Sequence, residues 1–145
     1  MKNKNLIKRL VFGSIFGIIF GFMCFYGFVS STGMPENLAK WQVWSWGNLM
    51  MWSTVANRMV LGVMVGIAGF ITTFPFWNAK IPVWIRGLKI GALISLPMAL
   101  GSLMGENTVV AIKGFWIIMI VGGLIGVIID LIITKIAGEG KELID

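Results

Sequence analysis

Four long stretches that are nearly free of charge constrain how this chain can fold. They cover residues 10–29, 59–77, 85–104 and 114–134. Each is close to the roughly 20 residues that an α-helix needs to cross about 30 Å of hydrocarbon. Because a bilayer offers the backbone no hydrogen-bond partners, only helices and closed barrels span it. The sequence therefore predicts an all-α integral membrane protein in which four transmembrane helices form a single domain, residues 1–145.

Composition supports the membrane class and excludes several kinds of site. Apolar residues make up 57% of the chain and charged residues 12%, against about 25% charged in soluble domains. There is no histidine, and Cys24 is the one cysteine, which excludes His-ligated haem or zinc and an internal disulfide. Paired carboxylates, a serine with a nearby base and a phosphate-binding loop are also missing from the sequence. We therefore expect no enzymatic activity, no cofactor and no metal.

The lysines and arginines predict the orientation. Nine of the twelve fall on one side of the predicted helices: Lys2, Lys4, Lys8, Arg9, Lys80, Arg86, Lys89, Lys135 and Lys141. Lys40, Arg58 and Lys113 fall on the other side. Cytoplasmic loops carry the excess of basic residues, so both termini are expected in the cytoplasm. The net charge of +6 is then an orientation signal and not a sign of nucleic-acid binding. No eukaryotic secretory motif is present, and the expected location is the plasma (inner) membrane of a prokaryote, with several passes.

The outer segment between the first two predicted helices, residues 36–57, is rich in tryptophan. It holds four of the seven tryptophans: Trp41, Trp44, Trp46 and Trp52. Indole rings favour the depth of the lipid headgroups. We therefore predict that these four residues are interfacial anchors, on an interfacial helix or on an outward extension of the second membrane helix. The alternative is an aromatic platform for sugars or lipid headgroups.

Each predicted helix also carries small residues at intervals of four. The glycines of these stripes are Gly13, Gly17, Gly21, Gly62, Gly66, Gly87, Gly91, Gly122 and Gly126. Lipid tails are as apolar as leucine, so helices associate in a bilayer through close van der Waals contact, which GxxxG patterns permit. The stripes predict a glycine-packed four-helix bundle. They are equally suited to contacts between subunits, and the pattern leaves both uses open.

Asp130 is the one acidic residue inside a predicted span. An ionisable group there is costly to bury and is by default a candidate functional residue. Asp130 follows Gly126 by four residues, which places its carboxylate on the packed face of the helix. One interpretation is a site for ion coupling. The other, which we favour, is a structural ion pair with Arg9, Arg86 or Lys89, which lie at the same membrane level.

Arg58, Glu106 and Pro97 complete the candidate pathway residues. With the spans given above, Arg58 marks the outer end of the second helix, where an ion pair with Glu106 is geometrically allowed. If that helix instead begins near Trp46, Arg58 enters the membrane as an anchor for an anion or a headgroup. Hydropathy favours the first arrangement. Pro97 interrupts the third helix, which predicts a kink and a free carbonyl near Leu93.

Two functional hypotheses follow. The first, which we favour, is a non-catalytic accessory or structural subunit that contacts the lipid bilayer and either copies of itself or a larger membrane protein. The second is a small homo-oligomeric transporter or channel, with Asp130 as the coupling or pathway residue.

Overall fold

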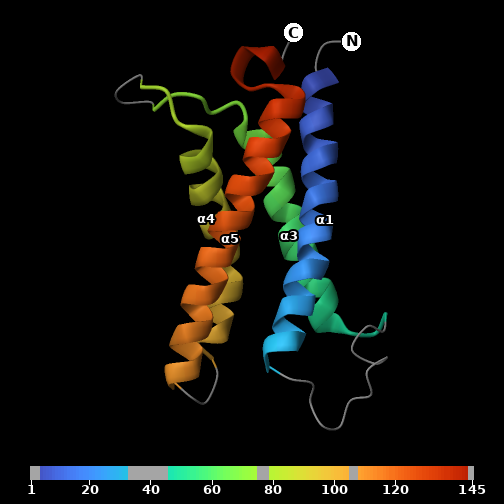
Figure 1. Cartoon of the computed structure of the whole chain (residues 1–145), viewed down its shortest axis with the longest axis vertical. Helices are drawn as coiled ribbons and strands as arrows, with labels where there is room; N and C mark the ends of the chain where they lie inside the picture. The colour runs from blue at the N-terminus through green and yellow to red at the C-terminus, as the bar shows by residue number, and fades with distance from the viewer. Residues whose placement is uncertain (1–3, 33–45, 75–78, 105–107, 144–145) are drawn as a thin grey trace.

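In a computed structural model, the residues that the structure describes form four long α-helices and one short 3-10 helix (Figure 1). Their bounds are α1 Lys4–Thr32, α3 Leu49–Ala68, α4 Val83–Ser102, α5 Thr108–Ala137 and η1 Gly140–Leu143. The structure describes residues 4–32, 46–74, 79–104 and 108–143. Within these ranges, each of the four α-helices is long and apolar enough to cross a membrane. The all-helical class and the four long helices predicted from the sequence are thus confirmed.

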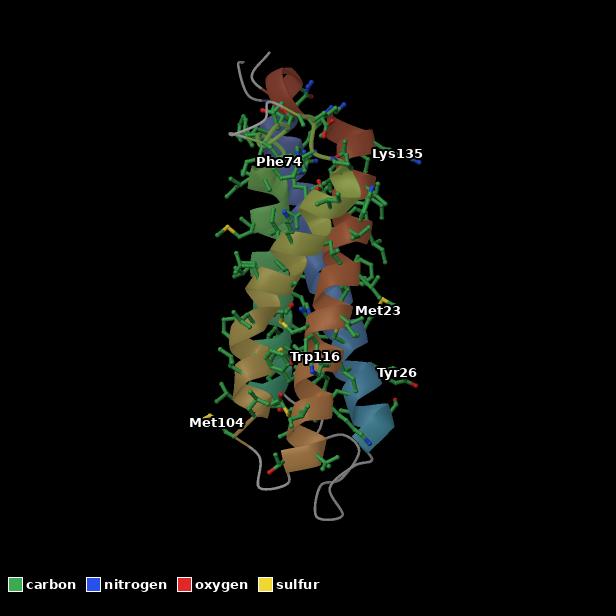
Figure 2. The ribbon with its side chains drawn as sticks, turned by 90° about the vertical axis from the view of Figure 1, so that its left-hand side faces the viewer. Met23, Tyr26, Phe74, Met104, Trp116 and Lys135 are labelled. Carbon is green, nitrogen blue, oxygen red and sulfur yellow. The ribbon has the colours of Figure 1, made fainter. Side chains whose placement is uncertain are left out.

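The helices form two antiparallel hairpins, α1 with α3 and α4 with α5 (Figure 1). The beginnings of α1 and α4 and the ends of α3 and α5 lie at the same end of the bundle, which we call the terminal end. Figure 2 shows Phe74 and Lys135 at this end and Met104 toward the other. The hairpins spread apart toward the end opposite the termini (Figure 1).

Glycine allows the backbones of α1 and α3 to touch. A Cβ atom at Gly17 would lie 2.8 Å from the Cα of Met59, and one at Gly21 would lie 2.7 Å from the Cα of Val55. Both distances are too short for non-bonded carbons, and the neighbouring atoms belong to the backbone, which cannot swing aside as a side chain can. Any larger residue at these positions would push the two helices apart.

The second hairpin is built in the same way. A Cβ atom at Gly126 would lie 2.8 Å from the Cα of Gly91, and one at Gly122 would lie 2.5 Å from the Cβ of Ser95. Across both hairpins, all nine glycines of the predicted stripes face the other helix of their own hairpin: Gly13, Gly17, Gly21, Gly62, Gly66, Gly87, Gly91, Gly122 and Gly126. The stripes are therefore used for contacts within the chain.

An apolar cluster joins the two hairpins. Its buried members are Leu61 and Val65 of α3 and Ile125, Ile129 and Ile133 of α5. These residues occupy the halves of α3 and α5 that lie nearer the terminal end. The hairpins therefore pack most closely in that half of the bundle, in agreement with their divergence toward the opposite end (Figure 1).

The predicted span 59–77 was wrong, because α3 runs from Leu49 to Ala68. The side chain of Asn48 caps the helix by accepting hydrogen bonds from the backbone N–H groups of Met50 and Met51, at 3.1 and 3.3 Å. After Ala68 the helix ends, and the chain becomes extended, with a β-bridge between Thr73 and Lys80. Hydropathy placed the helix too late, since the apolar residues after Ala68 resemble a span.

The other predicted spans lie largely within the observed helices, with different ends. In place of 10–29, 85–104 and 114–134, the helices cover Lys4–Thr32, Val83–Ser102 and Thr108–Ala137. Pro97 lies inside α4, which continues to Ser102.

Of the predicted outer segment, 36–57, residues 49–57 belong to α3, which agrees with the alternative of an outward extension of the second membrane helix. Of the four predicted anchors, Trp52 lies in α3 and Trp46 just before it. Trp41 and Trp44 lie outside the described residues.

A pair of alanine substitutions on α1 tests this packing. We expect Gly17→Ala to separate α1 from α3 and to lower the free energy of unfolding by roughly 1–3 kcal/mol, as overpacking does. Gly27→Ala is the matched control, since a Cβ atom at Gly27 would meet nothing within 4 Å. Thermal unfolding of both variants in the same detergent measures the difference, and equal midpoints would contradict the close contact.

Candidate functional site

The most extensive polar network of the described residues is buried near the terminal end, around Asp130. It joins Asp130 and Thr134 of α5 to Arg9 of α1, Arg86 of α4 and Glu139, which follows α5. We call these five residues the Asp130 cluster. The side chains of Asp130 and Arg9 are fully buried, and that of Arg86 is 2% exposed. The cluster therefore connects both hairpins through charged groups that are removed from solvent.

Both carboxylate oxygens of Asp130 are occupied. Arg86 binds them in a bidentate manner, with Nε donating to Oδ2 at 2.7 Å and Nη2 to Oδ1 at 3.0 Å. Arg9 Nη2 donates to Oδ1 at 2.8 Å, and Thr134 Oγ1 donates to the same oxygen at 3.2 Å. Charge-assisted bonds of this kind are the strongest that a buried carboxylate can accept. Asp130 is thus held by cations from two different helices.

Arg9 Nη1 also donates to Thr134 Oγ1 at 3.0 Å, and the other donors of Arg9 bind backbone carbonyls. Its Nε donates to the carbonyl of Gly66 at 3.1 Å, and its Nη1 to that of Gly138 at 2.6 Å. Gly66 lies in the last turn of α3, where carbonyls lack partners within the helix. Gly138 follows α5 with φ +73, a left-handed conformation that suits glycine at a helix end. Arg9 therefore ties α1 to the ends of α3 and α5.

Glu139 connects the cluster to the surface. Its Oε2 accepts from Arg86 Nη1 at 3.0 Å, and its Oε1 pairs with Lys80 Nζ at 3.2 Å. Lys80 is 76% exposed, whereas Glu139 is 16% exposed. Partial burial acts to raise the pKa of Glu139, but the hydrogen bonds from Arg86 and Lys80 outweigh it, so this pKa lies below its usual value.

Two of the three cations proposed for Asp130 are its partners in the structure. Lys89 is not a partner; its Nζ lies over the ring of Phe74, 5.3 Å from the ring centre. Sequence reasoning missed Glu139, which lies beyond the last predicted span. The one available signal was the pair of glycines around it, because Gly138 and Gly140 both have positive φ and turn the chain back toward the bundle.

Arg58 forms a second polar site, and its predicted place at the outer end of a helix was wrong. It lies in the middle of α3 and is 2% exposed. Its Nη1 donates to Ser95 Oγ of α4 at 2.5 Å, and Asn57 Nδ2 donates to the carbonyl of Ile94 at 3.1 Å. This carbonyl is next to that of Leu93, which Pro97 cannot bond because proline has no N–H. We call Asn57, Arg58 and Ser95 the Arg58 site.

Two polar atoms of the Arg58 site are not bonded by the described residues. Arg58 Nε and Asn57 Oδ1 are buried and have no hydrogen-bond partner there. No acidic side chain of the described residues forms an ion pair with Arg58. The predicted partner, Glu106, lies outside the described residues. Within the part of the chain that the structure describes, the two polar sites thus differ: every charge in the Asp130 cluster has an opposite charge beside it, and Arg58 has none.

A small aromatic group lies at the opposite end of the first hairpin. The rings of Trp46 and Trp52 stack with centroids 5.1 Å apart, and Trp52 Nε1 donates to the carbonyl of Trp46 at 3.0 Å. Phe22 of α1 meets Trp52 edge to face. Trp46 is 85% exposed. Both tryptophans stay predicted interfacial anchors.

Within the described ranges, no three His, Cys, Asp or Glu side chains come together to hold a metal ion. No known protein family, curated protein or solved structure matches the chain. The dominant chemical feature of the described polar sites is the set of buried guanidinium groups.

Removing the acid of the cluster is the sharpest test of its role. Asp130→Asn leaves Arg9 and Arg86 buried without their shared counter-charge, and breaking a buried pair in this way costs about 3–5 kcal/mol. We expect that loss in the free energy of unfolding. Lys135→Gln is the control, because Lys135 is an exposed cation on the same helix. A loss for Asp130→Asn no larger than that for Lys135→Gln would show that the cluster does not stabilise the bundle.

Because the pKa of Glu139 is lowered in the folded chain, we expect the stability of the protein to depend on pH. That pKa is lowered from 4.5, so the stabilising contribution of Glu139 is complete well above pH 4.5 and disappears as the pH falls through the lower folded value. The unfolding midpoint of the native chain should therefore exceed that of Glu139→Gln at pH 7, and the difference should shrink toward pH 3. Midpoints recorded at both pH values test this, and a constant difference would contradict it.

Proposed function

We propose that the chain is a multi-pass protein of a prokaryotic inner membrane, with both termini in the cytoplasm, and that it acts as a non-catalytic accessory or structural subunit. The observation that supports this most is the saturation of Asp130, whose two oxygens accept bonds from Arg9, Arg86 and Thr134. A coupling carboxylate has to release its partners in every cycle, whereas a structural one keeps them. The geometry favours a static role for Asp130.

The distribution of cations supports the proposed orientation. Lysines of the side predicted to be cytoplasmic lie at the terminal end or next to it: Lys4, Lys8, Lys80, Lys89 and Lys135. Basic residues concentrate on the cytoplasmic side of membrane proteins. Arg58 lies in the middle of α3 and not at the outer side. The excess of basic residues on the proposed cytoplasmic side is therefore larger than the sequence alone indicated.

The partner is proposed to be a larger membrane protein that packs on the outer face of the bundle. The glycine stripes are used inside the hairpins, so such a contact would involve large apolar side chains. On α5, Trp116, Ile117, Ile120 and Leu124 are each more than half exposed. They contact either lipid or a partner helix.

Photo-crosslinking in native membranes tests the subunit proposal. A crosslinking residue at Ile117 should trap one partner protein in stoichiometric yield, and the same residue at Ile7 of α1, similarly exposed, is the control for random contact. Crosslinks to lipid alone, or equal yields of many proteins from both positions, would contradict it.

The second candidate function, a small homo-oligomeric transporter or channel, is favoured by one observation. Arg58 is a buried cation in the middle of a helix that is long enough to span the membrane, and none of the described acidic side chains pairs with it. Charged groups at such positions commonly mark ion pathways. Ion flux through purified protein in proteoliposomes, above that of empty liposomes, would support this function, and Asp130→Asn would abolish it if Asp130 is the coupling residue.

A further inference from the structure

We propose that Arg58 anchors a binding site for a small monovalent anion, of the size of chloride, at the contact between α3 and α4. The proposal goes beyond the function proposed above and holds for either candidate function. It depends on the charge balance of the buried residues and on the two unbonded polar atoms of the Arg58 site.

The buried charges of the described residues do not cancel. The fully or nearly fully buried charged side chains are Arg9, Arg58, Arg86 and Asp130, which leaves an excess of two positive charges. Glu139, which is less buried, offsets part of this beside Arg86. Arg58 is too far from Asp130 to be compensated by it. Its partner Ser95 packs against Gly122, which lies eight residues before Asp130 on α5. Eight residues correspond to about 12 Å along a helix.

The burial of Arg58 without an opposite charge among the described residues is unfavourable, because a buried charge without an opposite charge destabilises a fold strongly. Of the described residues, Ser95 offers its guanidinium only a neutral hydroxyl oxygen. A small anion beside Arg58 supplies the opposite charge.

The two unbonded atoms define what this counter-ion would meet. Arg58 Nε is a donor without an acceptor, and Asn57 Oδ1 is an acceptor without a donor. An anion accepts the Nε–H bond, and a water molecule beside it donates one hydrogen to the anion and the other to Asn57 Oδ1. This pair of ligands satisfies both atoms. The ion has to be small, because Arg58 is 2% exposed and a lipid headgroup could not reach it.

Thermal unfolding of the full chain in lipid nanodiscs tests the site. Replacing sodium gluconate with sodium chloride at constant ionic strength should raise the unfolding midpoint of the native chain by roughly 5 °C at saturation. Arg58→Met should abolish the increase. Lys113→Met removes one exposed positive charge from α5 and should keep it.

Bromide provides a second measurement that needs no variant. Crystals of the native chain soaked in bromide should give an anomalous peak next to Arg58. The proposal is overturned if the native midpoint does not respond to chloride, if Arg58→Met responds equally, or if bromide is missing from the Arg58 site. If Arg58→Met does not fold, the bromide peak of the native chain tests the proposal: a peak next to Arg58 supports the anion site, and its absence overturns it.

Discussion

The need to compensate the buried carboxylate of Asp130 determines how the two hairpins meet. Asp130 lies on α5, while its partners lie on α1 and α4. The second hairpin supplies Arg86, and Arg9 is supplied only when the first hairpin docks on it. Separation of the hairpins would leave the carboxylate and Arg9 without each other inside the bilayer proposed here, at a high cost. The cluster therefore couples the folding of each hairpin to the assembly of the whole bundle.

Glycine contacts and charged contacts stabilise different parts of the bundle. In a bilayer, apolar surfaces gain little by leaving lipid, so helix association depends on close packing and polar bonds. Close backbone packing operates inside each hairpin, through pairs such as Gly13 with Gly62 and Gly91 with Gly122. The apolar cluster around Ile129 and the Asp130 cluster operate between them. The Arg58 site also joins the hairpins, but no acidic side chain of the described residues pairs with Arg58, which is why we propose a ligand there and a structural role for the Asp130 cluster.

Features that depend on local periodicity could be predicted from the sequence. The four long helices follow from charge-free stretches of about 20 residues, and the faces that carry glycine and the inward direction of Asp130 follow from spacings of four residues. Three further features depend on single polar contacts or turns that hydropathy does not detect. The bounds of α3 depend on the Asn48 cap, the burial of Arg58 depends on Ser95 of α4, and the position of Glu139 depends on the turn at Gly138. In a hydropathy profile an arginine lowers the score and so indicates the end of a span. The profile contains no information on a hydroxyl partner on another helix, such as Ser95 for Arg58.

Solid-state NMR in lipid bilayers tests the central role of Asp130 most directly. The chain has two aspartates and three arginines, so labelling aspartate with ¹³Cγ and arginine with ¹⁵N in its side chain gives few couplings, and Asp145→Glu leaves Asp130 as the one labelled aspartate. We expect strong ¹³C–¹⁵N dipolar coupling of the Asp130 carboxyl carbon to two guanidinium groups, with loss of one contribution in Arg9→Lys. A carboxyl carbon without coupling at the distance of a direct ion pair would contradict the central role of Asp130.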